Sequence, residues 1–113
     1  MPFGIFGKSK KEKKKKLSYK SGKQTKELKD AVWSKGKKVK GKNPNLHRKD
    51  AKGNEIYKPA YGKRGEKSWE IDHKKPKSKG GSHDIGNLQP LQSKANRDKG
   101  NKESKGLLSL LGL

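Results

Sequence analysis

The chain has 113 residues, of which 25% are apolar and 38% are charged, with a net charge of +21 and a pI near 10.2. This length suits one domain with a small core. The excess of positive charge predicts a polyanionic partner, either nucleic acid or an anionic membrane surface. Cysteine is absent, which excludes disulfides and thiolate-bound zinc, so a metal would need oxygen or imidazole ligands.

The hydropathy pattern argues against a membrane protein. No apolar run reaches the roughly 20 residues that a membrane-spanning helix needs. The first residues also lack the apolar core of a secretory signal peptide. We therefore expect a cytoplasmic protein.

The first third of the chain is mostly basic. Residues 1–20 contain a lysine block without apolar periodicity, which predicts a basic, disordered N-terminal tail. In the segment that follows, Leu28 and Val32 lie four residues apart, with Ser21 or Thr25 available as a cap. This pattern predicts a short helix that ends near residue 33.

The middle of the chain predicts irregular structure and a turn. Glycines and a proline interrupt any regular element between 34 and 44. Further on, Asp50 and Gly53 are turn residues that lead towards Ile56 and Tyr57, which suits a hairpin or turn.

The stretch SWEIDH predicts a half-buried strand that ends on an aspartate and a histidine. Trp69 and Ile71 alternate in it with Glu70 and Asp72, and His73 follows. We expect the apolar pair in the core. Glu70 is a solvated strand residue or a residue that orients a ligand, and direct contact with a metal is the less favoured alternative.

The order after this strand is loop, strand and helix. The lysine- and glycine-rich segment 74–86 predicts a surface loop, and NLQPL at 87–91 predicts a second strand. The residues after Pro90 can form about two helical turns before Gly100 ends them. The apolar residues 106–113 form a C-terminal tail that either covers the core or makes a contact.

These motifs together carry a resemblance. EIDHKKPKSKGGSHDIGNLQPL followed by KANRDKGNK resembles the HNH endonuclease family, with 15 positions from Asp72 to Asn87 and nine from Asn87 to Asn96. The resemblance implies an α+β fold built on a small ββα-metal finger, supported by the upstream helix and turn. We place the nuclease domain at 21–105 and its core motif at 69–102. The family also implies a bacterial, phage or mobile-element setting.

The residues themselves fit hydrolysis of a phosphodiester bond. A neutral imidazole at His73 can take a proton from water, which makes it the candidate general base. Asp72 and Asn96 offer hard oxygen ligands for one divalent cation, Mg²⁺ or Mn²⁺, with Zn²⁺ or Ni²⁺ as alternatives. By resemblance, Asn87 fixes the loop and orients the His73 ring.

Position 92 departs from the family. Many relatives carry a histidine four residues before the helical asparagine, where this chain has Gln92, a weak ligand if it faces the metal. Three cations on or after the helix and two in the loop are candidates to bind phosphate: Arg97, Lys99, Lys102, Lys74 and Lys79. We expect His47 to be structural or exposed, and His83 to be a residue of the surface loop, with a role as a ligand or substrate contact as the alternative.

Two other functions remain open at this level. The first is a noncatalytic nucleic-acid-binding module on an HNH scaffold. The second is a membrane-surface peptide, but such a peptide has no need for Asp72, Asn87 and Asn96 at these spacings. We therefore predict an HNH endonuclease acting on DNA, with RNA not excluded and no membrane partner. The sequence does not predict the oligomeric state.

Overall fold

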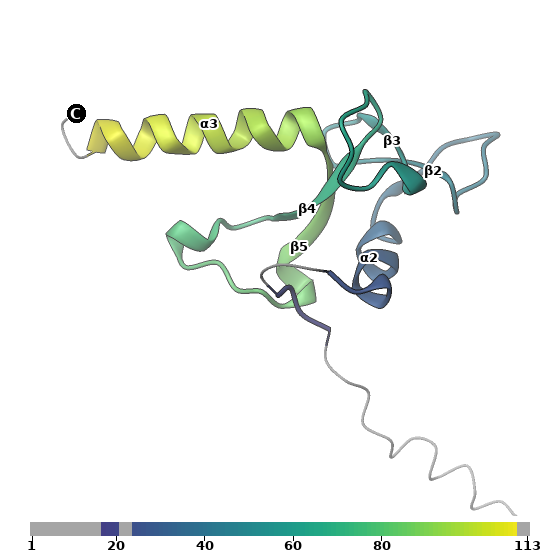
Figure 1. The fold of residues 1–113 in the computed structure, drawn as a ribbon, viewed down its shortest axis with the longest axis horizontal. Helices are drawn as coiled ribbons and strands as arrows, with labels where there is room; N and C mark the ends of the chain where they lie inside the picture. The colour runs from purple at the N-terminus through teal and green to yellow at the C-terminus, as the bar shows by residue number, and fades with distance from the viewer. Residues whose placement is uncertain (1–16, 21–23, 111–113) are drawn as a thin grey trace, which may run out of the picture.

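A computed structural model describes residues 17–20 and 24–110, with side chains up to Asn101. The elements are α2 (Lys26–Trp33), β1 (Lys37–Lys38), β2 (His47–Lys49), β3 (Glu55–Tyr57), β4 (Trp69–His73), β5 (Leu88–Gln92) and α3 (Ser93–Leu110), with 3-10 turns at Lys58–Ala60, Lys77–Lys79 and Ile85–Asn87. The fold is α+β, and its second half has the predicted order of strand, long loop, strand and helix (Figure 1).

The predicted short helix is α2, and its start follows from its cap. The Thr25 hydroxyl accepts a hydrogen bond from the backbone N–H of Leu28 at 3.1 Å, so the threonine rather than Ser21 is the cap. Leu28, Val32 and Trp33 are buried on one side of the helix. Ser21 lies outside the described residues.

The middle of the chain folds into a small antiparallel sheet in the order β1-β2-β3. The strands β2 and β3 form the hairpin that the turn residues predicted, with Ile56 fully buried. The two-residue strand β1 lies in the segment where we expected no regular element, because Lys37 and Lys38 pair with β2. This pairing is long-range and leaves no local signal.

A buried carboxylate joins this hairpin to the second half of the fold. Asp50 is 1% exposed and accepts hydrogen bonds from the backbone N–H groups of Lys52 at 3.0 Å, Asn54 at 2.8 Å and Gln92 at 2.9 Å. Gln92 ends β5, so one side chain holds both the turn and the point where α3 begins. The expected role of Asp50 in the turn is confirmed.

We expect Asp50→Ala to lower the free energy of unfolding by about 2–4 kcal/mol, because the buried N–H donors of Asn54 and Gln92 lose their acceptor. Urea denaturation followed by tryptophan fluorescence measures the change. Asp98→Ala is the matched control, since Asp98 is exposed and, among the described side chains, pairs with Lys94. The loss of unfolding free energy in this variant should stay within about 0.5 kcal/mol. Equal losses in the two variants would contradict the structural role of Asp50.

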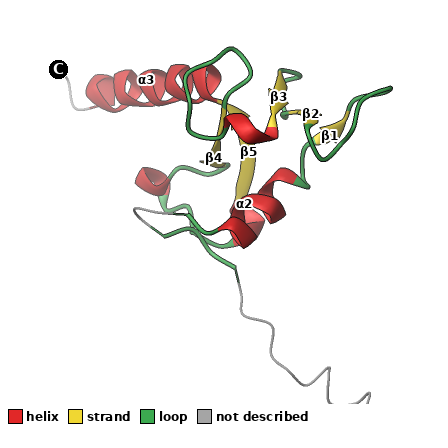
Figure 2. Cartoon of the chain, turned by 45° about the vertical axis from the view of Figure 1, so that its right-hand side comes forward, coloured by secondary structure: helices red, strands yellow, loops and turns green. Residues whose placement is uncertain are grey.

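The hairpin of β4 and β5 forms the centre of the domain. Its antiparallel register pairs Trp69 with Gln92 and His73 with Leu88. The buried residues on it, Trp69, Ile71 and Leu88, join α2 and Ile56 in one apolar cluster. The predicted core is thereby confirmed, and Figure 2 shows the hairpin lying between α2 and α3.

The last helix is longer than predicted. α3 runs from Ser93 to Leu110 and continues through Gly100, so the prediction that Gly100 ends it is wrong. Glycine costs a helix interior about 1 kcal/mol but does not end it, since a helix end also needs residues that cap it. The helix crosses the boundary that we placed at 105, and it projects from the rest of the fold (Figure 1).

The last residues of the predicted N-terminal tail pack against the folded domain. Leu17 and Tyr19 pack against the core cluster, and Ser18 forms a bridge with Asp84. The segment 17–20 therefore belongs to the domain, while 1–16 lie outside the described residues. In the described part of the chain, neither helix combines the length and the apolar character needed to cross a bilayer.

Candidate active site

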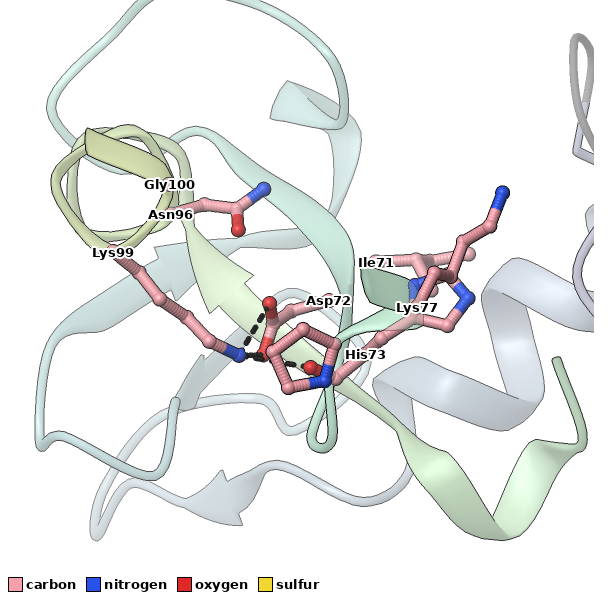
Figure 3. Close-up of a pocket in the computed structure, with 8 residues that line it drawn as sticks. Ile71, Asp72, His73, Lys77, Asn96, Lys99 and Gly100 are labelled. Carbon is pink, nitrogen blue, oxygen red and sulfur yellow. Dashed lines mark hydrogen bonds and ion pairs between the residues drawn. The ribbon is translucent and has the colours of Figure 1, made fainter. Parts of the chain in front are cut away.

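One pocket of about 210 Å³ gathers the predicted site residues between β4, the loop and α3 (Figure 3). Three residues that line it are Asp72, His73 and Asn96, which the sequence predicted to lie close together. The other lining residues are Ile71, Pro76, Lys77, Lys99 and Gly100. The hairpin supplies the aspartate and the histidine, and the first turns of α3 supply the asparagine.

Asp72 is a buried carboxylate with its own cation. It is 6% exposed, and the Lys99 ammonium lies 2.9 Å from both of its oxygens. Lys99 also donates to the carbonyl oxygen of His73 at 2.8 Å, and the Gln89 amide donates to Asp72 at 2.8 Å. Lys99 therefore neutralises a carboxylate that burial would otherwise destabilise.

Asn96 presents its amide oxygen to the pocket because Glu70 holds its nitrogen. The Asn96 Nδ2 donates to Glu70 Oε1 at 2.7 Å. In Figure 3 the amide oxygen lies on the side that faces Asp72. Glu70 is thus in position to orient the candidate ligand Asn96, which is one of the roles that the sequence left open for it.

These donors suit a hard cation. Among the side chains that the structure describes, no three histidine, cysteine or acidic residues come together as a metal cluster. One carboxylate and one amide oxygen instead share the pocket, a donor set typical of sites where water and phosphate complete the coordination of Mg²⁺. A cation bound to Asp72 would have to displace Lys99 from its oxygens.

The His73 ring points away from this pair of oxygens (Figure 3). Its Nε2 lies 3.1 Å from Nδ1 of His83, and the Tyr19 ring packs against it with centroids 4.8 Å apart. Partial burial, followed by the neighbouring His83, lowers the pKa of His73 below its ordinary value, although Asp72 acts in the opposite direction. This direction favours the neutral ring, which is the form that a general base requires.

Asn87 fastens the loop, as the resemblance implied. Its side-chain oxygen accepts from the backbone N–H of Lys75 at 2.9 Å, and its amide nitrogen donates to the carbonyls of Lys75 at 3.0 Å and Ser82 at 2.8 Å. The direct partner of the His73 ring is His83 rather than the Asn87 side chain. Asn87 thus acts on the loop that carries His83.

The double glycine lets the loop fold back. Gly80 has a φ of 84°, in the left-handed region that favours glycine. A Cβ at Gly81 would overlap the carbonyl oxygen of Lys75, so only glycine fits there. This close approach brings His83 back towards the end of β4.

Gln92 does not lie where the sequence placed it. It is the last residue of β5, so the prediction that it lies on the helix one turn before Asn96 is wrong. Its amide donates to the carbonyl of Glu66 at 2.8 Å. The strand reaches position 92 because Trp69 pairs with it across the hairpin.

The predicted phosphate-binding cations are spread around the pocket. Arg97 on α3 and Lys74 and Lys79 in the loop are exposed, whereas Lys99 is paired with Asp72. The side chain of Lys102 lies outside the described ones. Lys77, which the sequence did not single out, lines the pocket.

A second, basic cleft of about 150 Å³ lies next to this site. Four lysines line it: Lys35, Lys37, Lys49 and Lys74. Gln89, which contacts Asp72, also lines it. Burial, and after it Lys74, lowers the pKa of Lys35. The acidic residue in the lining is Asp50.

Sequence reasoning missed several of these contacts. Gln89 lies opposite Asp72 only because of the hairpin register, and Tyr19 reaches His73 from a segment that we assigned to the tail. Neither contact has a local signal. For His83, its place after the double glycine was a signal, since a loop that folds back there returns the histidine to the strand end.

The comparison with protein families finds a match over this part of the chain. The family model of the HNH endonucleases matches residues 62–102, which include β4, the loop, β5 and the first part of α3. Neither the curated proteins nor the solved structures contain a match to the chain. The segment 62–102, in which Asp72, His73 and Asn96 line one pocket, thus matches the HNH endonuclease family.

Proposed function

We propose that the chain is a metal-dependent endonuclease that hydrolyses phosphodiester bonds of DNA. HNH domains generally act as nucleases and typically use a divalent metal ion. The observation that carries the proposal is the pocket that Asp72, His73 and Asn96 share. The basic surface around it supports a nucleic-acid substrate.

Different residues of the chain would bind the metal and accept the proton. Asp72 and Asn96 would hold one Mg²⁺ or Mn²⁺ by their oxygens. When bound, such an ion stabilises negative charge on the phosphate and on the departing oxygen. His73 accepts a proton from water, whose oxygen then bonds to phosphorus as the bond to the departing oxygen breaks.

The surrounding cations position the substrate. The four lysines of the basic cleft and the exposed Arg97 can contact phosphates on either side of the cleaved bond. Such contacts favour backbone over base sequence, so we expect low sequence specificity and strong dependence on salt. We place the catalytic domain at 21–105 together with the packed segment 17–20 and the end of α3, and the lysine-rich residues 1–16 would add nonspecific affinity.

We expect the protein to nick supercoiled plasmid in the presence of Mg²⁺ or Mn²⁺ and to stop when the metal is chelated. Gel electrophoresis of plasmid after incubation with metal, or with EDTA, measures this. Labelled single-stranded DNA, duplex DNA and RNA in the same assay identify the preferred substrate. Plasmid that stays supercoiled with each metal would contradict the proposal.

One observation favours a second function, a noncatalytic nucleic-acid-binding module. Lys99 forms an ion pair with Asp72 in the structure and so occupies the oxygens that a metal needs. In such a module this pair would be structural. Chelation separates the two functions, since binding alone persists in EDTA and cleavage does not.

A further inference from the structure

His73 contacts a second histidine for which the proposed function has no role. Nε2 of His73 lies 3.1 Å from Nδ1 of His83, and the ring planes meet at 73°. A hydrogen bond at this distance needs one nitrogen to donate and the other to accept. The contact therefore couples the tautomer of His73 to that of His83.

Contacts from outside the loop hold this pair in place. The Tyr19 ring stacks on His83 with centroids 5.7 Å apart and 18° between the planes, and it meets His73 in a T-shaped contact at 4.8 Å. The backbone N–H of Tyr19 donates to the carbonyl of His83 at 2.8 Å, and Ser18 pairs with Asp84. Both ring and backbone contacts thus fix His83.

Two tautomer arrangements satisfy the hydrogen bond. Either Nε2–H of His73 donates to His83 and both rings carry their proton on Nε2, or the bond is reversed and both carry it on Nδ1. Neutral histidine prefers the Nε2–H form in water, so the first arrangement is favoured for both rings. It leaves a lone pair on Nδ1 of His73.

We propose that His83 is the positioning residue of His73: it accepts the Nε2–H hydrogen bond and leaves Nδ1 as the nitrogen that takes the proton from water. This inference rests on the proposed function and names the atom and the partner through which His73 acts. His83 thereby fixes both the orientation and the tautomer of the His73 ring.

Substitutions that move or remove the acceptor atom, Nδ1 of His83, test the proposal. We expect His83→Leu to lower kcat about 10- to 100-fold and to leave KM nearly unchanged, as is typical for residues that orient a functional histidine. His83→Asn should restore most of the activity, because its Oδ1 stands where Nδ1 stood. His83→Gln, whose oxygen lies one carbon further out, should not. The matched control is His47→Leu, on the other sheet, with an unchanged kcat.

Nitrogen-15 NMR of the histidine rings provides a readout that needs no cleavage. The parent should show Nε2 of His73 protonated and Nδ1 unprotonated at neutral pH, and His83→Leu should show a mixture of tautomers. A proton on Nδ1 of His73 in the parent overturns the proposal, as does an unchanged kcat in folded His83→Leu. If His83→Leu fails to fold, equal activity of the Asn and Gln variants overturns it. A parent that shows the predicted tautomer but cleaves nothing overturns the proposed function instead.

Discussion

Replacement of His73 by alanine is expected to abolish cleavage and to leave nucleic-acid binding nearly intact. General base catalysis contributes about 10²- to 10⁴-fold to a rate, and the alanine side chain has no proton acceptor. The substitution leaves unchanged the cations that we expect to bind phosphate, which are the lysines of the basic cleft and the exposed Arg97. The attraction of the protein to nucleic acid should therefore persist. Binding and chemistry should separate in this one variant.

The measurement combines plasmid nicking with fluorescence anisotropy of a labelled duplex at several salt concentrations. His47→Ala is the matched control, since His47 packs against Tyr57 on the other sheet. A His73→Ala variant that nicks at the parental rate would remove His73 from the mechanism. If His73→Ala loses nucleic-acid binding as strongly as cleavage, the ring binds the substrate and does not act as the general base.

The pH dependence of the parent should follow from the same ring. Its pKa lies below the ordinary value of 6.5 because burial and His83 disfavour the charged form. The folded protein therefore binds this proton only at a lower pH than the unfolded chain does. The stability from this neutral ring is complete above 6.5 and is lost as pH falls through the lowered pKa. Cleavage should fall over the same acidic range.

The sequence predicted the elements whose patterns are local. The alternation from Trp69 to Asp72 and the spacing of Leu28 and Val32 each specify one buried face, and the strand and the helix lie where these patterns put them. Asp72, His73 and Asn96 share a pocket because the strand end and the first turns of α3 are fixed by the hairpin between them. A short motif could predict this much.

What the sequence could not predict depends on contacts between distant segments. The strand continues to Gln92, and the helix begins one residue later, because Trp69 and Asp50 supply partners from elsewhere in the chain. Likewise, the sequence predicted that Lys99 binds phosphate, whereas in the structure Lys99 forms an ion pair with Asp72. The helix brings this lysine to the carboxylate, and burial of the carboxylate makes the pairing favourable.

That ion pair leads to the second large effect, at Asp72. We expect Asp72→Asn to abolish metal-dependent cleavage and to weaken Mg²⁺ binding, because the variant loses the charged oxygen of the candidate site. Lys99→Gln should act in the opposite direction on metal binding. It removes the ammonium that competes for the carboxylate and keeps an N–H donor for it. We expect the dissociation constant for Mg²⁺ to fall by about tenfold, or about 1.4 kcal/mol.

Calorimetric titration of the protein with Mg²⁺, without nucleic acid, measures both changes apart from turnover. Lys94→Gln is the matched control, because it makes the same change in charge on the same helix at an exposed pair with Asp98. If Lys94→Gln tightens Mg²⁺ binding as much as Lys99→Gln does, the effect is one of net charge and the two cations do not compete for Asp72. If Asp72→Asn binds Mg²⁺ as the parent does, the metal lies elsewhere, and the ion pair of Asp72 with Lys99 is a structural feature of the domain.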